Sequence, residues 1–263
     1  MAKTAAFFDL DKTIIAKSSS LAFSRPFQAG GLISRGTMLR SAYAQFLFLV
    51  GGADHDQMEK MRRFMSQLVE GWDVATVREI VADTLHNIVD PLVYDEAVDL
   101  IEEHHAAGRD VVVVSASGSD VVEPIGEMLG ADHVIASRLA IAEGRYTGEI
   151  DYYAYAEEKA RAIEDLAAER GYDLAECWAY SDSITDQHML EIVGHPHVVN
   201  PDKELRRLAR ANGWPVLLFS RPVGLRSRRL PPARPTLAAL AVGGAMTAAG
   251  VLWSQARRRR PSA

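Results

Sequence analysis

The sequence predicts an α/β protein in which a parallel sheet lies between two layers of helices. Short apolar runs alternate with amphipathic stretches over most of the chain, which is the pattern of strand–helix repeats. One run, residues 111–115, is apolar on both faces, as is typical of a strand at the centre of a parallel sheet. With 263 residues, of which 48% are apolar and 24% charged, the chain can build one substantial domain with an appendage, or two small ones.

Composition and charge argue against several classes of protein function. Cys177 is the single cysteine, so the chain forms no internal disulfide and no multi-cysteine zinc site, which fits a reducing compartment. All 35 acidic residues precede Arg221, whereas nine of the 29 Lys and Arg lie at or after it. Residues 1–220 are therefore strongly acidic, and we expect no nucleic-acid partner. No secretory signal opens the sequence, so the body is expected in the cytoplasm.

The first third of the chain predicts one strand followed by a helical insert. Residues 4–8 form a short apolar run that meets two carboxylates abruptly, which indicates a buried strand. Helical spacing then extends from residue 14 to about 87, with apolar stripes in 56–70 and 73–88. A further stripe in this insert consists of Leu39, Tyr43, Phe46, Leu47 and Val50.

The remaining elements alternate between helix and strand. The predicted helices are 91–107, 119–129, 156–170, 185–193 and 202–212, and the predicted strands are 111–115, 133–137, 176–181 and 197–199. Glu143-Gly144 indicates a hairpin within 138–148. Ligands of such sheets bind beyond the carboxyl ends of the strands.

Polar clusters follow three of the predicted strands, and Lys159 lies near the start of a later helix. The clusters are Asp9-Leu-Asp-Lys-Thr13, Ser115-Ala-Ser-Gly118 and Ser181-Asp-Ser-Ile-Thr-Asp186. Their four carboxylates, Asp9, Asp11, Asp182 and Asp186, would repel one another in one crevice unless a cation lay among them. Mg²⁺ favours carboxylate oxygens together with water and substrate phosphate.

Each cluster alone has a simpler interpretation. Paired acids are common at helix N-caps, and a serine that ends a strand is usually a turn residue. Lys159, taken alone, is expected to be a solvent-exposed charge on a helix. The ordered combination of all four features is what indicates a shared site.

In this order the motifs resemble the haloacid dehalogenase-like (HAD) hydrolase superfamily, specifically its phosphoserine-phosphatase-like subfamily IB. The resemblance covers about residues 4–220. It implies a three-layer Rossmann-like parallel sheet with a helical C1-type cap inserted after the first strand. The catalytic core is then 1–13 with 91–220, and the cap is 14–90.

The resemblance also implies a Mg²⁺-dependent phosphatase acting on a small phosphorylated substrate. Asp9 is the implied nucleophile, which forms an aspartyl-phosphate, and Asp11 the implied general acid and base. Asp9, Asp11, Asp182 and Asp186 are the implied metal residues. Ser115, Ser117 and Lys159 are the implied phosphate-binding residues.

Departures from this pattern bear on the substrate. Ser18 stands where phosphoserine phosphatases carry a cap glutamate that binds the substrate amine, so phosphoserine is disfavoured and a lysophospholipid-type phosphate is the alternative. The insert is rich in large apolar groups, namely Phe23, Phe27, Tyr43, Phe46, Phe48 and Phe64, which either pack the helices together or line an apolar pocket. An alternative of another class is a regulatory protein that binds a phosphate ligand or holds a phospho-aspartate with little turnover.

The C-terminal tail has a composition of its own. Residues 221–235 hold five arginines and four prolines and are expected to form an extended linker. Residues 236–253 carry no charge and precede the basic tail 254–263 with Arg257-Arg-Arg-Arg260. As a helix, 18 residues reach about 27 Å, close to the thickness of a bilayer core. A C-terminal membrane anchor is therefore predicted, with an interfacial helix on anionic lipid or a disordered tail as the alternatives.

Overall fold

The computed structural model describes residues 3–33 and 66–222, and the structural statements below concern these residues. The strands are β1 (Ala5–Asp9), β2 (Asp110–Gly118), β3 (His133–Ala142), β4 (Arg145–Tyr152), β5 (Trp178–Ser181), β6 (His195–Val199) and β7 (Val216–Leu217). The α-helices are α1 (Ser19–Ala22), α2 (Ser24–Ala29), α5 (Val74–Ile88), α6 (Asp95–Ala106), α7 (Ser119–Leu129), α8 (Glu157–Arg170), α9 (Gln187–Glu191) and α10 (Lys203–Asn212). Short 3₁₀ helices lie at Asp90–Leu92, Leu174–Glu176 and Ile184–Asp186.

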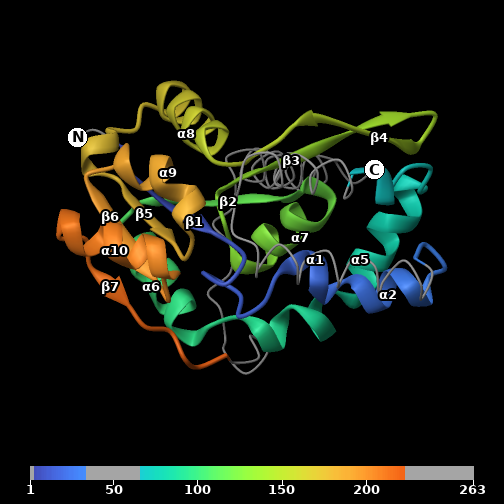
Figure 1. Ribbon diagram of the computed structural model, residues 1–263, viewed down its shortest axis with the longest axis horizontal. Coiled ribbons are helices and arrows are strands. Elements are labelled where there is room, and N and C mark those ends of the chain that lie inside the picture. Colours follow the sequence, from blue (N-terminus) through green and yellow to red (C-terminus); the bar gives the residue numbers. More distant parts are fainter. Residues whose placement is uncertain (1–2, 34–65, 223–263) are drawn as a thin grey trace, which may run out of the picture. The chain divides into compact units, whose positions relative to one another are not determined.

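The strands form one seven-stranded sheet in the order β4-β3-β2-β1-β5-β6-β7. All neighbouring pairs are parallel except β3 and β4, which are antiparallel. β1 lies between β2 and β5, and all five of its residues are buried (Figure 1). The ends of β1, β2 and β5 therefore bring three separate parts of the chain to one edge of the sheet.

Helices cover both faces of this sheet. On one face, the core cluster joins side chains of β1, β2, β5 and β6 to those of α8, α9 and α10, such as Ile163, Met189 and Leu205. On the other face, the Phe8 ring contacts His104 of α6, with ring centroids 5.8 Å apart. The chain thus has the predicted three-layer α/β architecture.

The hairpin between β3 and β4 forms where Glu143-Gly144 indicates a turn. Both residues have positive φ angles, 49° and 75°, as the tight turns that suit twisted hairpins require. β3 continues through Ala142, beyond the predicted end at residue 137, because its second half pairs with β4.

The predicted elements of the core agree with the observed ones within a few residues. The structure contains one further strand, β7, that the sequence did not predict. This two-residue edge strand escapes prediction because it is too short for a periodic pattern. In the insert, the predicted helix 73–88 corresponds to α5. Leu39 to Val50 and most of 56–70 lie outside the described residues, as do Tyr43, Phe46, Phe48 and Phe64.

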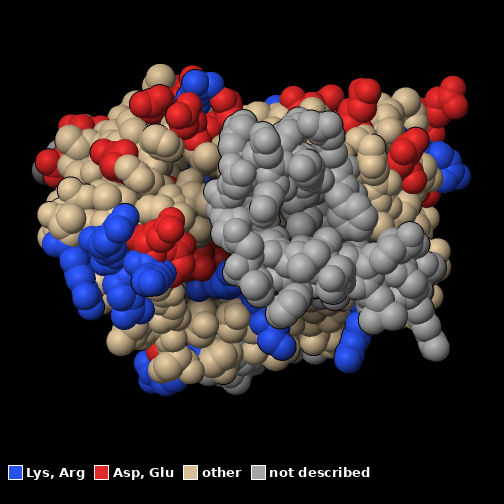
Figure 2. Space-filling model, in the orientation of Figure 1, with Lys and Arg blue, Asp and Glu red and all other residues tan. Residues whose placement is uncertain are grey.

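Charge is unevenly spread over the surface. Figure 2 shows carboxylates gathered over α8 and cationic side chains over α10, where Lys203, Arg206, Arg207 and Arg210 are exposed. No helix within 3–33 and 66–222 is long and apolar enough to span a bilayer, and the predicted anchor 236–253 lies outside those ranges.

Candidate active site

The two carboxylates of the first motif lie at the carboxyl end of the central strand. Asp9 is the last residue of β1 and is 6% exposed. The chain then turns sharply: Lys12 has a φ angle of 64°, and the amides of Ile14 and Ile15 both donate to the Leu10 carbonyl at 3.0 Å. This turn keeps Asp11 next to the strand end.

Lys159 joins the first motif to the last one. It lies in the first turn of α8, and its Nζ donates to Asp9 Oδ1 at 2.7 Å and to Asp186 Oδ2 at 2.9 Å. All three side chains are less than 10% exposed. Burial opposes the charge of Lys159, but the two carboxylates outweigh it and raise the pKa of this lysine above its usual value. The cation therefore stays charged in the interior.

The carboxylate of Asp11 is held by serines from two elements. The Ser19 amide, at the start of α1, donates to Oδ1 at 2.6 Å, and the Ser117 hydroxyl donates to Oδ2 at 3.1 Å. The Ser19 hydroxyl in turn donates to Ser117 Oγ at 2.9 Å. Burial raises the pKa of Asp11, and these hydrogen bonds offset part of that effect. Ser115, which is 1% exposed, accepts a hydrogen bond from the Ser117 amide at 3.2 Å.

The loop after β5 carries the other two acids. The Ser181 hydroxyl donates to Asp186 Oδ2 at 2.7 Å. This oxygen therefore accepts hydrogen bonds from both Ser181 and Lys159. Burial, and then the charge of Asp186, raises the pKa of Asp182 to about 7. Asp202 fixes the loop from outside, since its amide donates to the Asp182 carbonyl and its Oδ2 accepts from the Ile184 amide, both at 2.8 Å.

Comparison with known proteins identifies the family of this site. Residues 6–191 match the family model described as haloacid dehalogenase-like hydrolase. The chain belongs to the haloacid dehalogenase-like hydrolase family. The resemblance drawn from the four motifs is thereby confirmed, and the chain is an enzyme of the hydrolase class.

Two curated relatives of this HAD hydrolase match nearly its whole length. The "Inhibition of morphological differentiation protein" of Streptomyces azureus is 61% identical and is matched over 98% of this chain and 95% of its own. A "Probable phosphatase" of Mycobacterium tuberculosis is 58% identical, over 98% of this chain and 90% of its own.

Solved structures agree on the architecture. A protein of unknown function from Bordetella pertussis Tohama I superposes with a TM-score of 0.73 at 28% identity, covering 82% of this chain and 99% of its own. A phospho-aspartyl intermediate analogue of phosphoserine phosphatase superposes with a TM-score of 0.62 at 21% identity, covering 86% and 97%. At that identity the second likeness speaks for the fold alone.

The acids of this HAD hydrolase fit a divalent cation only in part. Within the described ranges, no three Asp, Glu, His or Cys side chains are grouped so as to hold a metal ion. Three of the four predicted metal residues have other partners. Serines hold both oxygens of Asp11, Lys159 and Ser181 hold Oδ2 of Asp186, and Lys159 also holds Oδ1 of Asp9. The second carboxylate oxygen of Asp9 and the carboxylate of Asp182 remain as side-chain candidates. Burial and neighbouring acids raise the pKa of both carboxyls, which is the electrostatic setting that a hard cation relieves.

The structure brings every predicted site residue to the same edge of the sheet, and it adds three residues that were not among the predicted ones. Ser19 and Ser181 are bonded to the predicted acids, and Asp202 fixes the loop that carries two of them. The run Lys17-Ser-Ser-Ser20 and the serine before Asp182 were the available signals. Serine is so common in turns that neither signal could be separated from a structural role.

Proposed function

We propose that this chain is a Mg²⁺-dependent phosphatase that hydrolyses a phosphate monoester through an aspartyl-phosphate intermediate. The observation that carries the proposal is the buried Lys159, whose Nζ joins Asp9 and Asp186 while Asp11 stands apart, held by serines. Two carboxylates with such different surroundings suit different roles, one as a nucleophile and one as an acid and base. The 58% identical relative described as a probable phosphatase supports the same activity.

The proposed reaction has two displacements at phosphorus. A carboxylate oxygen of Asp9 attacks phosphorus, and the bond from phosphorus to the leaving oxygen breaks as Asp11 gives that oxygen its proton. Asp11 then takes a proton from water, whose oxygen attacks the same phosphorus and releases phosphate, restoring Asp9. Ser115, Ser117 and Lys159 supply donors and positive charge to the phosphoryl oxygens.

Asp9 and Asp182, with the backbone carbonyl of Asp11, are the groups that would hold Mg²⁺, and Asp186 would support them through its contacts with Lys159 and Ser181. When bound, the ion supplies positive charge that offsets the repulsion between the Asp9 carboxylate and the anionic substrate.

The helical insert 14–90 is proposed as a cap over the core formed by 1–13 and 91–220, and as the part that selects the substrate. Ser18 has no charge with which to bind an amine, which disfavours phosphoserine and leaves a lysophospholipid-type phosphate as the alternative. Membrane association through 236–253 agrees with that alternative, and the exposed cations of α10 would favour an anionic lipid surface.

Substitution of Asp9 tests the proposal. Asp9→Asn keeps the size of the side chain but removes the nucleophile, so phosphate release from a panel of monoesters should fall at least about 10³-fold. Removal of Mg²⁺ with a chelator should have a comparable effect, reversed by added Mg²⁺. Asp165→Asn, an exposed carboxylate of α8, is the matched control and should retain activity. Wild-type protein that releases no phosphate from any monoester in the panel would refute the proposal.

Asp11→Asn separates an enzyme from a regulatory protein that stays phosphorylated. If Asp11 activates water, this variant should accumulate a phosphoryl group on Asp9, detectable by mass spectrometry, and turn over about 10²- to 10⁴-fold more slowly. A wild-type aspartyl-phosphate that persists for hours would favour the regulatory alternative.

A further inference from the structure

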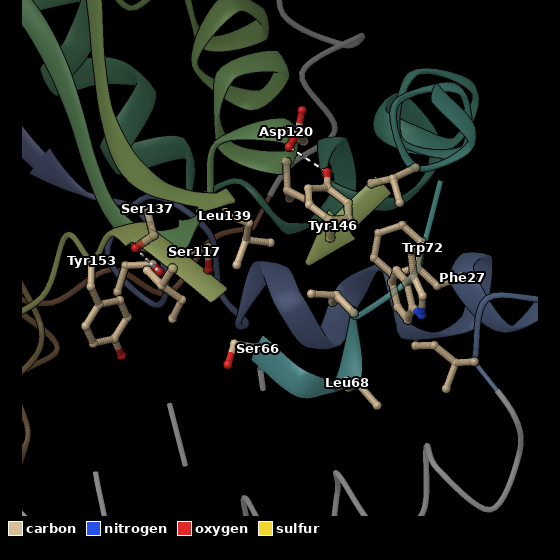
Figure 3. A pocket seen from close by; sticks show the side chains of 17 residues that line it. Phe27, Ser66, Leu68, Trp72, Ser117, Asp120, Ser137, Leu139, Tyr146 and Tyr153 are labelled. Atoms are coloured by element: carbon tan, nitrogen blue, oxygen red, sulfur yellow. Dashed lines mark hydrogen bonds between the residues drawn. The ribbon is translucent and has the colours of Figure 1, made fainter. Parts of the chain in front are cut away.

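A cavity of about 330 Å³ opens beside the candidate active site (Figure 3). Its walls come from the helical insert on one side, and from the end of β2, the start of α7, β3 and β4 on the other. The apolar and aromatic lining includes Phe27, Leu68, Trp72, Leu139, Ile150 and Tyr146. At one end the rings of Phe27 and Trp72 meet edge to face, with centroids 5.5 Å apart.

The cavity adjoins the proposed general acid through Ser117. Ser117 lines the cavity, and its hydroxyl donates to Asp11 Oδ2 at 3.1 Å. Ala116 and Gly118, which flank that serine, also line it. A leaving oxygen within reach of the Asp11 carboxyl therefore has this cavity beside it, and the group attached to that oxygen can extend into it.

The described residues of the lining offer no charged partner for an ammonium or a carboxylate. Among the described lining residues there is no Lys, Arg or His, and the single carboxylate is Asp120. That carboxylate is already bound on both oxygens, by Arg78 Nε at 2.6 Å and by the Tyr146 hydroxyl at 2.6 Å. A buried charge without a partner is costly, so an ammonium or a carboxylate on the substrate would be disfavoured here.

The walls are held together by hydrogen bonds between the insert and the hairpin. The Gly71 amide donates to the Tyr146 carbonyl at 2.8 Å, and the Tyr146 amide donates to the Trp72 carbonyl at 3.1 Å. The cavity is thus built by backbone pairing between two parts of the chain and does not depend on one side-chain contact.

We infer that the substrate is the phosphate monoester of an uncharged, apolar alcohol, whose alkyl or ring portion fills this cavity. The inference rests on the proposed phosphatase activity and names its substrate class. The volume is at the small end of the roughly 300–1,000 Å³ of small-molecule pockets, so it suits a single ring or a medium alkyl chain. The inference disfavours phosphoserine, whose ammonium and carboxylate would both lack a charged partner among the described lining residues.

A series of n-alkyl phosphates tests the inference on the unaltered protein. Methyl, butyl, hexyl and octyl phosphate have similar leaving groups, so differences in kcat/KM report how the chain is bound. Burial of each added methylene should raise kcat/KM roughly two- to fourfold until the cavity is full. A 7-carboxyheptyl phosphate, which has eight carbons like the octyl ester, should have a kcat/KM at least about 100-fold below that of the octyl ester. Equal kcat/KM across the series, or a preference for the carboxylated ester or phosphoserine, would overturn the inference.

Two variants test whether the dependence of kcat/KM on the alkyl chain arises in this cavity. Trp72→Ala should flatten the dependence on chain length, and Leu139→Arg should invert the preference in favour of the carboxylated ester by supplying a partner for its charge. Leu218→Ala, at an exposed site outside the cavity, is the matched control and should keep the wild-type pattern. An unchanged pattern in both folded cavity variants would overturn the inference. Failure of the phosphatase proposal is distinguishable, because no ester of any length would then be hydrolysed.

Discussion

His104 of α6 is a buried histidine outside the proposed chemistry. Its Nδ1 lies 3.2 Å from Arg109 Nη1, and its Nε2 lies 2.9 Å from the Tyr180 hydroxyl. Because arginine can only donate, Nδ1 accepts, and Nε2 carries the proton and donates to Tyr180. Burial, followed by the positive charge of Arg109, lowers the pKa of His104 to about 4.

This histidine should make the fold less stable in acid. In the unfolded chain His104 binds a proton near pH 6.5, whereas in the folded chain it does so only near pH 4. Because the folded state binds fewer protons than the unfolded chain between these two pH values, the free energy of unfolding falls as the pH is lowered from 6.5 to 4. The total decrease due to His104 is about 2–3 kcal/mol. Urea unfolding of wild type and His104→Gln at pH 7.5, 5.5 and 4.5 measures it, since the carboxylates of the site affect both proteins alike. Parallel pH profiles of the two proteins would contradict the assignment.

At the scale of elements, Asp202 couples a helix to the loop of the site. Its Oδ1 caps α10 by accepting from the amides of Glu204 and Leu205, at 2.9 and 2.8 Å. Its Oδ2 and its own amide hold the loop that carries Asp182. One side chain thus fixes the start of α10 and the position of a proposed metal residue.

Asp202→Ala should therefore affect both stability and turnover. Loss of the cap should lower the free energy of unfolding by about 1–2 kcal/mol, and the displaced loop should lower kcat/KM roughly tenfold. Asp173→Ala is the matched control, because Asp173 caps the 3₁₀ helix before β5 through the Ala175 amide. Urea unfolding and phosphate release on both variants distinguish the two effects. If the two variants have the same kcat/KM, Asp202 acts on the helix alone.

For the whole molecule, charge divides the chain into an acidic body and a basic tail. Nine arginines lie at or after Arg221, and no acidic residue follows it. The last described residues are fixed to α6, where Glu96 accepts from the Ser220 amide at 3.0 Å and the Arg221 carbonyl accepts from the Asp95 amide at 2.8 Å. The basic segment therefore starts from a defined point on the body.

The full chain should consequently bind vesicles that contain phosphatidylserine more tightly than vesicles of phosphatidylcholine alone, and salt should weaken the binding. A chain shortened to residues 1–222 should lose most of it. The double variant Arg206→Glu with Arg207→Glu should bind more weakly than wild type because it reverses charge on the exposed face of α10. Co-sedimentation measures all three. Equal binding by the full and shortened chains would refute the role of the tail.

The class of fold and the order of the core elements could be predicted from the amino-acid sequence, and its motifs singled out the four acids of the proposed site. Burial pattern and turn chemistry are local properties, so the apolar strand β2 and the turn at Glu143-Gly144 could be predicted from neighbouring residues alone. Three of the four motifs could be recognised because each lies at the end of a strand, and parallel strands end at one edge of the sheet. The fourth, Lys159, lies near the start of a helix, and only its place in the order of the motifs pointed to it.

The pairing of carboxylate oxygens with their hydrogen-bond donors emerges only from the packed fold. Lys159 joins Asp9 across 150 residues, and Ser117 reaches Asp11 across 106. The apolar cavity depends on the same kind of distant contact, because its walls come from the insert and from the hairpin. Such pairings depend on packing between elements far apart in the chain, and no local periodicity records them.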